Sequence, residues 1–242
     1  MPAIEIIDLS PFVPVGGSRR LTGHLARPQG TGPWPGVVAV HEVFGANDVM
    51  LRQVERLAYA GYLAVMPDLF TQGGAWRCLA ATLRAARSGR GRAYQDITAA
   101  CSYLKGRQDC TNSIGVIGFC MGGGFALMTA ARGDFAAASA NYGPLPRRPD
   151  ATLVGACPIV ASYGGQDRLL PGAAARLATV LDRLGVVHDV CEYPEAGHGF
   201  LNDEQAGPAL FRPLFRVLGI GPNPEAAAQA WHRIETFFGT HL

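Results

Sequence analysis

The sequence predicts an α/β fold, a three-layer sandwich whose mostly parallel sheet has helices on both faces, built as one domain over residues 1–242. Strand-like and helix-like segments alternate with short connections, which is typical of a parallel sheet covered by helices. Residues 37–40 are continuously apolar, as in a strand that is buried on both faces. The sequence contains no internal repeat and no linker long enough to separate two domains.

The first elements are two edge strands followed by the buried strand and a helix. Residues 3–9 alternate in polarity, and residues 21–28 follow a turn signal, so both segments are expected to be strands. Apolar side chains recur at helical spacing over residues 48–60. We expect Asp48 to cap the start of this helix and Gly61 to end it.

The same alternation continues to the end of the chain. Further strands are expected over residues 62–68, 113–119, 135–143, 157–165 and 186–194. Further helices are expected over residues 76–87, 94–105, 121–132, 172–185 and 225–242.

Composition excludes several classes of protein. Hydrophobic residues make up 48% and charged residues 17% of the chain, which indicates a compact globular protein rather than a disordered one. A net charge of +2 is too small for a nucleic-acid-binding surface. The N-terminus lacks a secretory signal pattern, and no uncharged apolar run is long enough to span a membrane, so we expect a cytoplasmic protein.

The six cysteines give no sign of a metal or redox centre. They are scattered and form no C-x-x-C pair, so neither a zinc site nor a dithiol motif is indicated, and no cofactor is expected. In a reducing compartment most of them are expected to be small buried hydrophobes.

Cys120 has a more specific context. Residues 118–122 have the spacing of a nucleophile elbow, G-x-S-x-G, with cysteine in the place of serine. The two glycines would let backbones approach closely, and the thiol would lie at a helix N-terminus, where the helix dipole favours a thiolate. A free thiol has a pKa of about 8.5 and therefore needs a neighbouring base at neutral pH.

Other chemically capable residues follow the ends of other predicted strands. In an open α/β sheet, ligands bind at the carboxyl ends of the strands. Glu42, Cys120, Asp167 and His198 all follow strands, and the order nucleophile, acid, histidine is that of α/β-hydrolases. His198 would be the general base, and Asp167 would hold its tautomer.

Two backbone N–H groups are candidates for an oxyanion hole. Met121 follows the nucleophile directly, and Val43 lies in the loop after the first buried strand. Each triad residue alone is more often structural, but their occurrence in order after separate strands favours the catalytic interpretation. His41 also follows a strand but precedes the nucleophile, and we interpret it as a packing residue or a support for the site.

The chain resembles the dienelactone hydrolase family. The similarity runs through the segments GVVAVHEVFGAN, LAYAGYLAVMPDLF, IGVIGFCMGGGFAL, GGQDRLLP and EAGHGFLND. The resemblance implies an α/β-hydrolase fold without a large cap domain and hydrolysis of small lactones and esters by Cys120, His198 and Asp167. It also implies that Glu42 binds the resting thiol until substrate displaces the carboxylate.

Two positions depart from the family pattern. Members that cleave dienelactones hold the substrate carboxylate with two arginines, and the matching positions here are Gln72 and Asn202. Neither amide forms a charge-assisted bidentate pair, so the expected substrate is an ester or lactone that is neutral or is held in a different way. Arg77 is a candidate for a replacement cation. An apolar substrate pocket, or alternatively the core, is expected to contain Phe44, Phe70, Trp76, Tyr142 and Phe200.

The sequence therefore predicts a carboxymethylenebutenolidase-like esterase that acts on a small ester or lactone through an acyl-enzyme. Alternatives are a thioesterase or peptidase on the same fold, and a binding protein that retains the pocket with little catalysis. A redox-sensing thiol is a weaker alternative, because it needs a resolving cysteine near Cys120. We expect a monomer or weak homodimer with a small-molecule substrate and no nucleic-acid or membrane partner.

Overall fold

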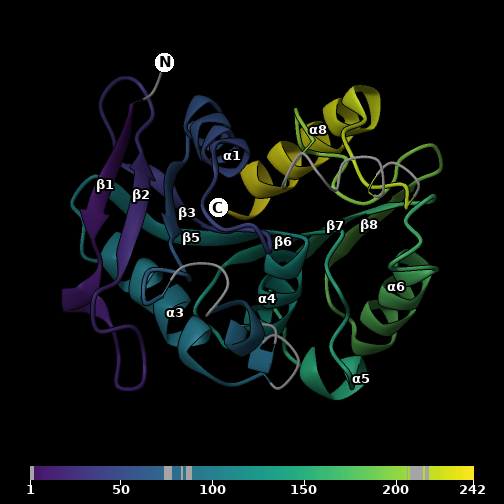
Figure 1. Ribbon diagram of the computed structural model, residues 1–242, viewed down its shortest axis with the longest axis horizontal. Coiled ribbons are helices and arrows are strands. Elements are labelled where there is room, and N and C mark those ends of the chain that lie inside the picture. Colours follow the sequence, from purple (N-terminus) through teal and green to yellow (C-terminus); the bar gives the residue numbers. More distant parts are fainter. Residues whose placement is uncertain are drawn as a thin grey trace.

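The computed structural model describes residues 3–73, 78–82, 84–85, 89–205, 207, 215 and 218–242. An eight-stranded sheet with strand order β1-β2-β4-β3-β5-β6-β7-β8 crosses the molecule (Figure 1). The strands are β1 (Ile4–Asp8), β2 (Thr22–Ala26), β3 (Trp34–Val40), β4 (Leu63–Pro67), β5 (Cys110–Phe119), β6 (Ala137–Asn141), β7 (Ile159–Gly164) and β8 (His188–Tyr193). β2 pairs antiparallel with β1 and β4, and the remaining pairs are parallel.

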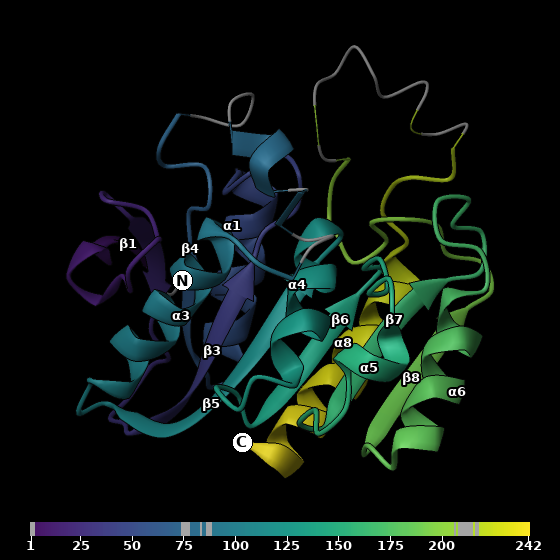
Figure 2. The ribbon, with the colours of Figure 1, turned by 90° about the horizontal axis from the view of Figure 1, so that it is seen from below.

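Helices cover both faces of this sheet. They are η1 (Ser10–Phe12), α1 (Asp48–Tyr59), α3 (Arg92–Lys105), α4 (Met121–Ala130), α5 (Pro149–Thr152), α6 (Ala173–Leu184) and α8 (Pro224–His241). Figure 1 shows α1 and α8 on one face and α3, α4 and α6 on the other, and Figure 2 views the molecule from the side of the second group. The predicted three layers and mostly parallel sheet are thereby confirmed.

The continuous apolar run in β3 follows from these two layers. Val38 and Val40 belong to the core beneath α3, α4 and α6, whereas Val37 and Ala39 belong to the core beneath α1 and α8. Successive side chains of a strand point to opposite faces, so a strand that is covered on both sides needs apolar residues at every position. The central strands thus end at one edge of the sheet with their side chains fixed by both cores.

Several element boundaries differ from the sequence prediction. Asn47, not Asp48, caps α1, because its side chain accepts a hydrogen bond from the Met50 N–H at 3.0 Å. β5 begins at Cys110 rather than at residue 113, through an irregular start in which Asn112 has a φ of 65°. The short helix α5 was not predicted.

The helix predicted over residues 76–87 is described only in part. Residues 78–82 and 84–85 are helical, whereas Trp76 and Arg77 lie outside the described residues. No helix in the described part of the chain is both long enough and apolar enough to cross a membrane.

Candidate active site

Cys120 lies in a tight turn between β5 and α4. Its φ of 54° and ψ of −116° are unusual for a residue with a side chain, and such strain is typical of functional positions. The turn is held by the Cys120 N–H, which donates to the Asn141 carbonyl at 3.0 Å, and by the Cys120 carbonyl, which accepts from the Gly123 N–H at 3.0 Å. The thiol is half-buried and lies at the N-terminus of α4.

The glycines on either side of Cys120 are required by backbone contacts. A Cβ atom on Gly118 would lie 1.9 Å from the Gly122 carbonyl oxygen, and one on Gly122 would lie 2.0 Å from the Val40 carbonyl oxygen. Any side chain at either position would therefore separate the first turn of α4 from the ends of β5 and β3. The glycines of the elbow place Cys120 and Met121 beside the loop that begins at His41.

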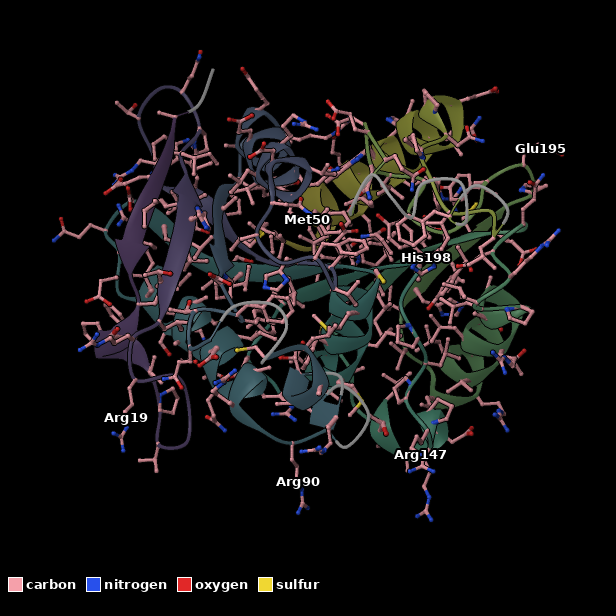
Figure 3. All side chains as sticks on the ribbon, in the orientation of Figure 1. Arg19, Met50, Arg90, Arg147, Glu195 and His198 are labelled. Carbon is pink, nitrogen blue, oxygen red and sulfur yellow. The ribbon has the colours of Figure 1, made fainter. Side chains whose placement is uncertain are left out.

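His198 and Asp167 form the closest polar pair of the site. The Nδ1 atom of His198 lies 2.7 Å from Oδ2 of Asp167, and both side chains are buried. Asp167 follows β7, and its other carboxylate oxygen accepts from the Leu169 N–H at 2.9 Å. The backbone of His198, in the loop after β8, is held by hydrogen bonds to Gly219 and Gly221. Figure 3 shows His198 within the body of the molecule.

The pKa of His198 depends on both of its neighbours, Asp167 and Cys120. Burial alone would lower the pKa of His198, but the hydrogen bond to Asp167 and the hydrogen bonding and charge of Cys120 outweigh it and raise this pKa to about 10. Within the described residues, Nε2 of His198 is buried and has no partner in full hydrogen-bond geometry. Cys120 is therefore close enough to affect the ring without being ideally aligned with it.

Glu42 follows β3 and is buried at 4% exposure. Its two carboxylate oxygens accept hydrogen bonds from the amides of Asn47 and Asn202, each at 3.4 Å. Burial raises the pKa of Glu42, and the two amides and the charge of His198 oppose that effect. The Tyr142 hydroxyl donates to Oδ1 of Asn202 at 3.4 Å, which extends the network beyond the carboxylate.

Two of the aromatic residues predicted for the pocket, Tyr142 and Phe200, lie beside His198. The ring of Tyr142 packs edge-on against the rings of His198 and Phe200, with centroid distances of 5.2 Å and 5.7 Å. The ring of Phe70 packs edge-on against that of His41, with their centroids 4.8 Å apart. The ring of half-buried Phe44 lies beside that of Phe215, with their centroids 6.1 Å apart. Tyr142, Phe200 and Phe70 are buried, so they shape the site as part of the core.

Among the described residues, Gln72, which was predicted to lie in the substrate pocket, has no hydrogen bond to the triad. It is exposed, and its side-chain oxygen accepts a hydrogen bond from Arg92 at 3.2 Å rather than from a residue of the triad.

The partners of Glu42 were not predicted from the sequence, although Asn47 lies in the same loop and Asn202 was selected for its position alone. In the described ranges, no group of three His, Cys, Asp or Glu side chains could hold a metal ion.

An open hollow of about 650 Å³ lies elsewhere, between the loop after β6 and α6, and none of the triad residues line it. Leu145, Arg147 and Arg176 are among its lining residues, and Figure 3 shows Arg147 at the edge of the molecule. We place the candidate active site at Cys120, because the nucleophile geometry and the buried histidine–carboxylate pair occur there and not at the hollow.

Comparisons with known proteins show the family and the fold of the chain. The model of the dienelactone hydrolase family matches residues 21–242. A carboxymethylenebutenolidase from Pseudomonas putida is 28% identical, over 76% of this chain and 83% of its own length. The dienelactone hydrolase structure from Anabaena variabilis has a TM-score of 0.68 at 22% identity, covering 100% of this chain and 99% of that chain. An alpha/beta hydrolase from a deep-sea metagenome library also has a TM-score of 0.68, at 15% identity over 98% of both chains, which confirms the predicted α/β-hydrolase fold.

The elbow geometry leads to a prediction about stability. We expect Gly122→Ala to lower the free energy of unfolding by roughly 3 kcal/mol, the upper part of the usual range for overpacking. The added Cβ would collide with the Val40 carbonyl, which is backbone and cannot move aside. Urea denaturation measures the effect. Gly239→Ala in α8 is the matched control, since nothing lies within 4 Å of its Cβ position, and equal stability losses in the two variants would contradict the prediction.

Proposed function

Because the chain belongs to the dienelactone hydrolase family and is a carboxylic ester hydrolase, we propose that it cleaves a small, uncharged ester or lactone through an acyl-enzyme on Cys120. The proposal rests above all on the buried 2.7 Å hydrogen bond between His198 and Asp167 beside the strained Cys120 turn. A nucleophile, a base and a carboxylate that orients the base are the components of nucleophilic acyl transfer.

In the first half of the proposed reaction, Cys120 is acylated. The proton shared by Cys120 and His198 lies on Nε2 of His198 during the attack, and the sulfur forms a bond to the carbonyl carbon of the substrate. The tetrahedral intermediate then collapses, the bond from carbon to the leaving oxygen breaks, and His198 returns the proton to that oxygen. In a lactone the leaving alcohol remains attached to the acyl group.

In the second half, water releases the acyl group. His198 accepts a proton from the water, the water oxygen bonds to the thioester carbon, and the carbon–sulfur bond breaks. The proton on His198 is then shared again with the released sulfur of Cys120, as at the start of the cycle. Throughout the cycle the carboxylate of Asp167 keeps the Nδ1 atom of His198 protonated, so that Nε2 faces the nucleophile. The product is a carboxylate, which the negative charge of Glu42 helps to expel.

Two backbone N–H groups support the proposed oxyanion hole. Among the described residues, neither the Val43 N–H nor the Met121 N–H has a hydrogen-bond acceptor, so both are available to a substrate oxygen. Gly122 brings the start of α4 against the Val40 and His41 carbonyls, so Met121 and Val43 lie on adjoining segments. Donors of this kind stabilise the negative oxygen of the tetrahedral intermediate.

The charges around Glu42 support an uncharged substrate. In the part of the chain that the structure describes, the groups that act on this buried carboxylate are Asn202, Asn47 and His198, and none of them is an arginine or lysine. Asn202 occupies a position where the family resemblance leads us to expect a carboxylate-binding arginine. A second carboxylate near Glu42 would meet like-charge repulsion that an amide cannot offset.

The first prediction concerns the nucleophile. We expect Cys120→Ala to lower kcat/KM for p-nitrophenyl acetate by at least about 10⁴-fold, as removal of a triad nucleophile typically does. Mass spectrometry of the wild-type enzyme during turnover should find the acetyl group on Cys120. Cys157→Ala is the control, because that half-buried cysteine lies outside the site. Wild-type turnover by Cys120→Ala would exclude the acyl-enzyme proposal.

The second prediction concerns pH. A histidine whose pKa is raised to about 10 stays protonated through neutral pH and loses its proton as the pH rises through that value. Since the protonated ring donates to the leaving oxygen, kcat/KM should fall only on the strongly alkaline side. Asp167→Asn removes the largest contribution that raises this pKa. We expect the alkaline limb to move at least one pH unit lower and the maximum rate to fall roughly 10⁴-fold.

The pH profile of kcat/KM, recorded with an alkyl ester such as ethyl butyrate, whose leaving alkoxide needs a proton, tests this expectation. Asp189→Asn is the control, because this half-buried carboxylate of β8 pairs with Arg233 and not with His198. An alkaline limb that keeps its position in Asp167→Asn would contradict the assignment of that limb to His198.

The third prediction concerns substrate charge. We expect p-nitrophenyl butyrate to be hydrolysed at least about tenfold faster than p-nitrophenyl hemisuccinate, which corresponds to only ~1.4 kcal/mol of repulsion. Both substrates have acyl chains of similar length, and kcat/KM is compared. Glu42→Gln removes a negative charge and should lower the ratio of kcat/KM for the butyrate ester to kcat/KM for the hemisuccinate ester. Asn202→Asp adds a negative charge and should raise this ratio. Faster hydrolysis of the anionic ester by the wild-type enzyme would require a cation that binds its carboxylate.

A further inference from the structure

His41 joins the two loops that follow β3 and β4. Its side chain is fully buried, directly after the last residue of β3. Its Nδ1 atom lies 2.7 Å from the Glu42 carbonyl oxygen, and the Leu69 N–H donates to Nε2 at 3.1 Å. Both ring nitrogens are therefore used, each by the backbone of a different loop.

These two contacts fix the tautomer of the ring. A backbone N–H can only donate, so Nε2 of His41 is an unprotonated acceptor. Nδ1 must then bear the proton and donate it to the Glu42 carbonyl. Burial lowers the pKa of His41, against smaller opposing effects of the Glu42 carbonyl and Asp68, which agrees with a neutral ring.

The Glu42 carbonyl belongs to the same peptide group as the Val43 N–H. A trans peptide is planar, and its C=O and N–H bonds point in opposite directions. The carbonyl of Glu42 accepts from His41 Nδ1 and also from the Gly45 N–H at 3.1 Å. With its carbonyl held on one side, this peptide directs the Val43 N–H to the other side, where no described residue accepts its hydrogen bond.

We propose that His41 is a positioning residue for the oxyanion hole, which holds the Glu42–Val43 peptide so that the Val43 N–H faces the substrate oxygen. This inference rests on the proposed function, in which the Val43 and Met121 N–H groups bind that oxygen. A rotation of the peptide would instead present the Glu42 carbonyl to the developing negative charge, which would oppose catalysis. The hydrogen bond at the carbonyl also polarises the peptide and makes its N–H a better donor.

Neighbouring contacts make this bond a specific constraint. The ring of Phe70 packs edge-on against His41 at 4.8 Å and keeps the imidazole in its plane. Gly45 has a φ of 82°, so the loop turns sharply just beyond the constrained peptide. The carbonyl of His41 itself would lie 2.9 Å from a Cβ on Gly122, which places the same segment against the first turn of α4.

Two substitutions separate the two bonds of the ring. In His41→Asn the side-chain amide nitrogen takes the place of Nδ1 and can donate to the Glu42 carbonyl, while the bond to Leu69 is lost. In His41→Gln the side-chain oxygen takes the place of Nε2 and can accept from Leu69, while the bond to Glu42 is lost. Both variants remove the same ring and leave one amide, so each is the control for the other.

The expected result is a split between the two variants. We expect His41→Gln to lower kcat for p-nitrophenyl acetate by 10²- to 10³-fold, about the loss caused by removing one oxyanion donor, with KM nearly unchanged. His41→Asn should keep kcat within about tenfold of the wild type. A trifluoromethyl ketone, which forms a tetrahedral adduct with an oxyanion, should lose affinity in parallel with kcat. Alkylation of Cys120 by iodoacetamide, which forms no oxyanion, should be equally fast in both variants.

Equal losses of kcat in the two variants, or a slower His41→Asn, would overturn the inference. Such a result with turnover still dependent on Cys120 would leave the proposed function intact, whereas activity in Cys120→Ala would overturn the proposed function itself. A measurement on the wild-type enzyme needs no variant to fold. The His41 Nδ1 proton should resonate in the NMR spectrum and shift downfield when the trifluoromethyl ketone adduct forms, and an unchanged resonance would also overturn the inference.

Discussion

The close approach of the first turn of α4 to the ends of β5 and β3 is the contact on which the site depends. Gly122 leaves no room for a side chain beside the Val40 carbonyl, and Gly118 leaves none beside Gly122. This contact fixes three things at once: the strained backbone of Cys120, the position of the Met121 N–H, and the distance from both to the loop after β3. The two cores hold the strands on either face, so their ends have little freedom to relax.

The remaining polar groups reach the site from other strand ends, and each is buried with a partner. Asp167 accepts from His198, and Glu42 accepts from Asn47 and Asn202. Burial without such partners would neutralise the carboxylates or destabilise the fold. The site is therefore rigid for the same reason that it is charged: each ionisable side chain is fixed by the hydrogen bonds that permit its burial.

The sequence was sufficient to predict the layers, the sheet and the residues at the strand ends, because those depend on apolar periodicity and on short motifs. It was not sufficient for contacts between loops. Asn47 was missed as the helix cap because the adjacent Asp48 is an equally good capping residue, and only the backbone conformation distinguishes them. His41 was predicted to pack or to support the site, but its two backbone partners, 1 and 28 residues away, follow from the register of β3 beside β4. The exposure of the Gln72 side chain could not be predicted either, because Gln72 lies in a loop whose sequence has no periodic pattern.

The two buried carboxylates of the site differ in the partners that balance their charge. Asp167 raises the pKa of His198 through their hydrogen bond, against the effect of burial, so this carboxylate lies beside a ring that carries a positive charge. Glu42 accepts hydrogen bonds only from neutral amides among the described residues, and burial raises its pKa against the smaller effects of those amides and of the charge of His198. In the proposed reaction, a substrate carbonyl bound between the Val43 and Met121 N–H groups would carry the developing negative charge on its oxygen. Stabilisation of that oxygen, rather than of the resting thiolate, is then the step in which the geometry of the loop after β3 has its effect.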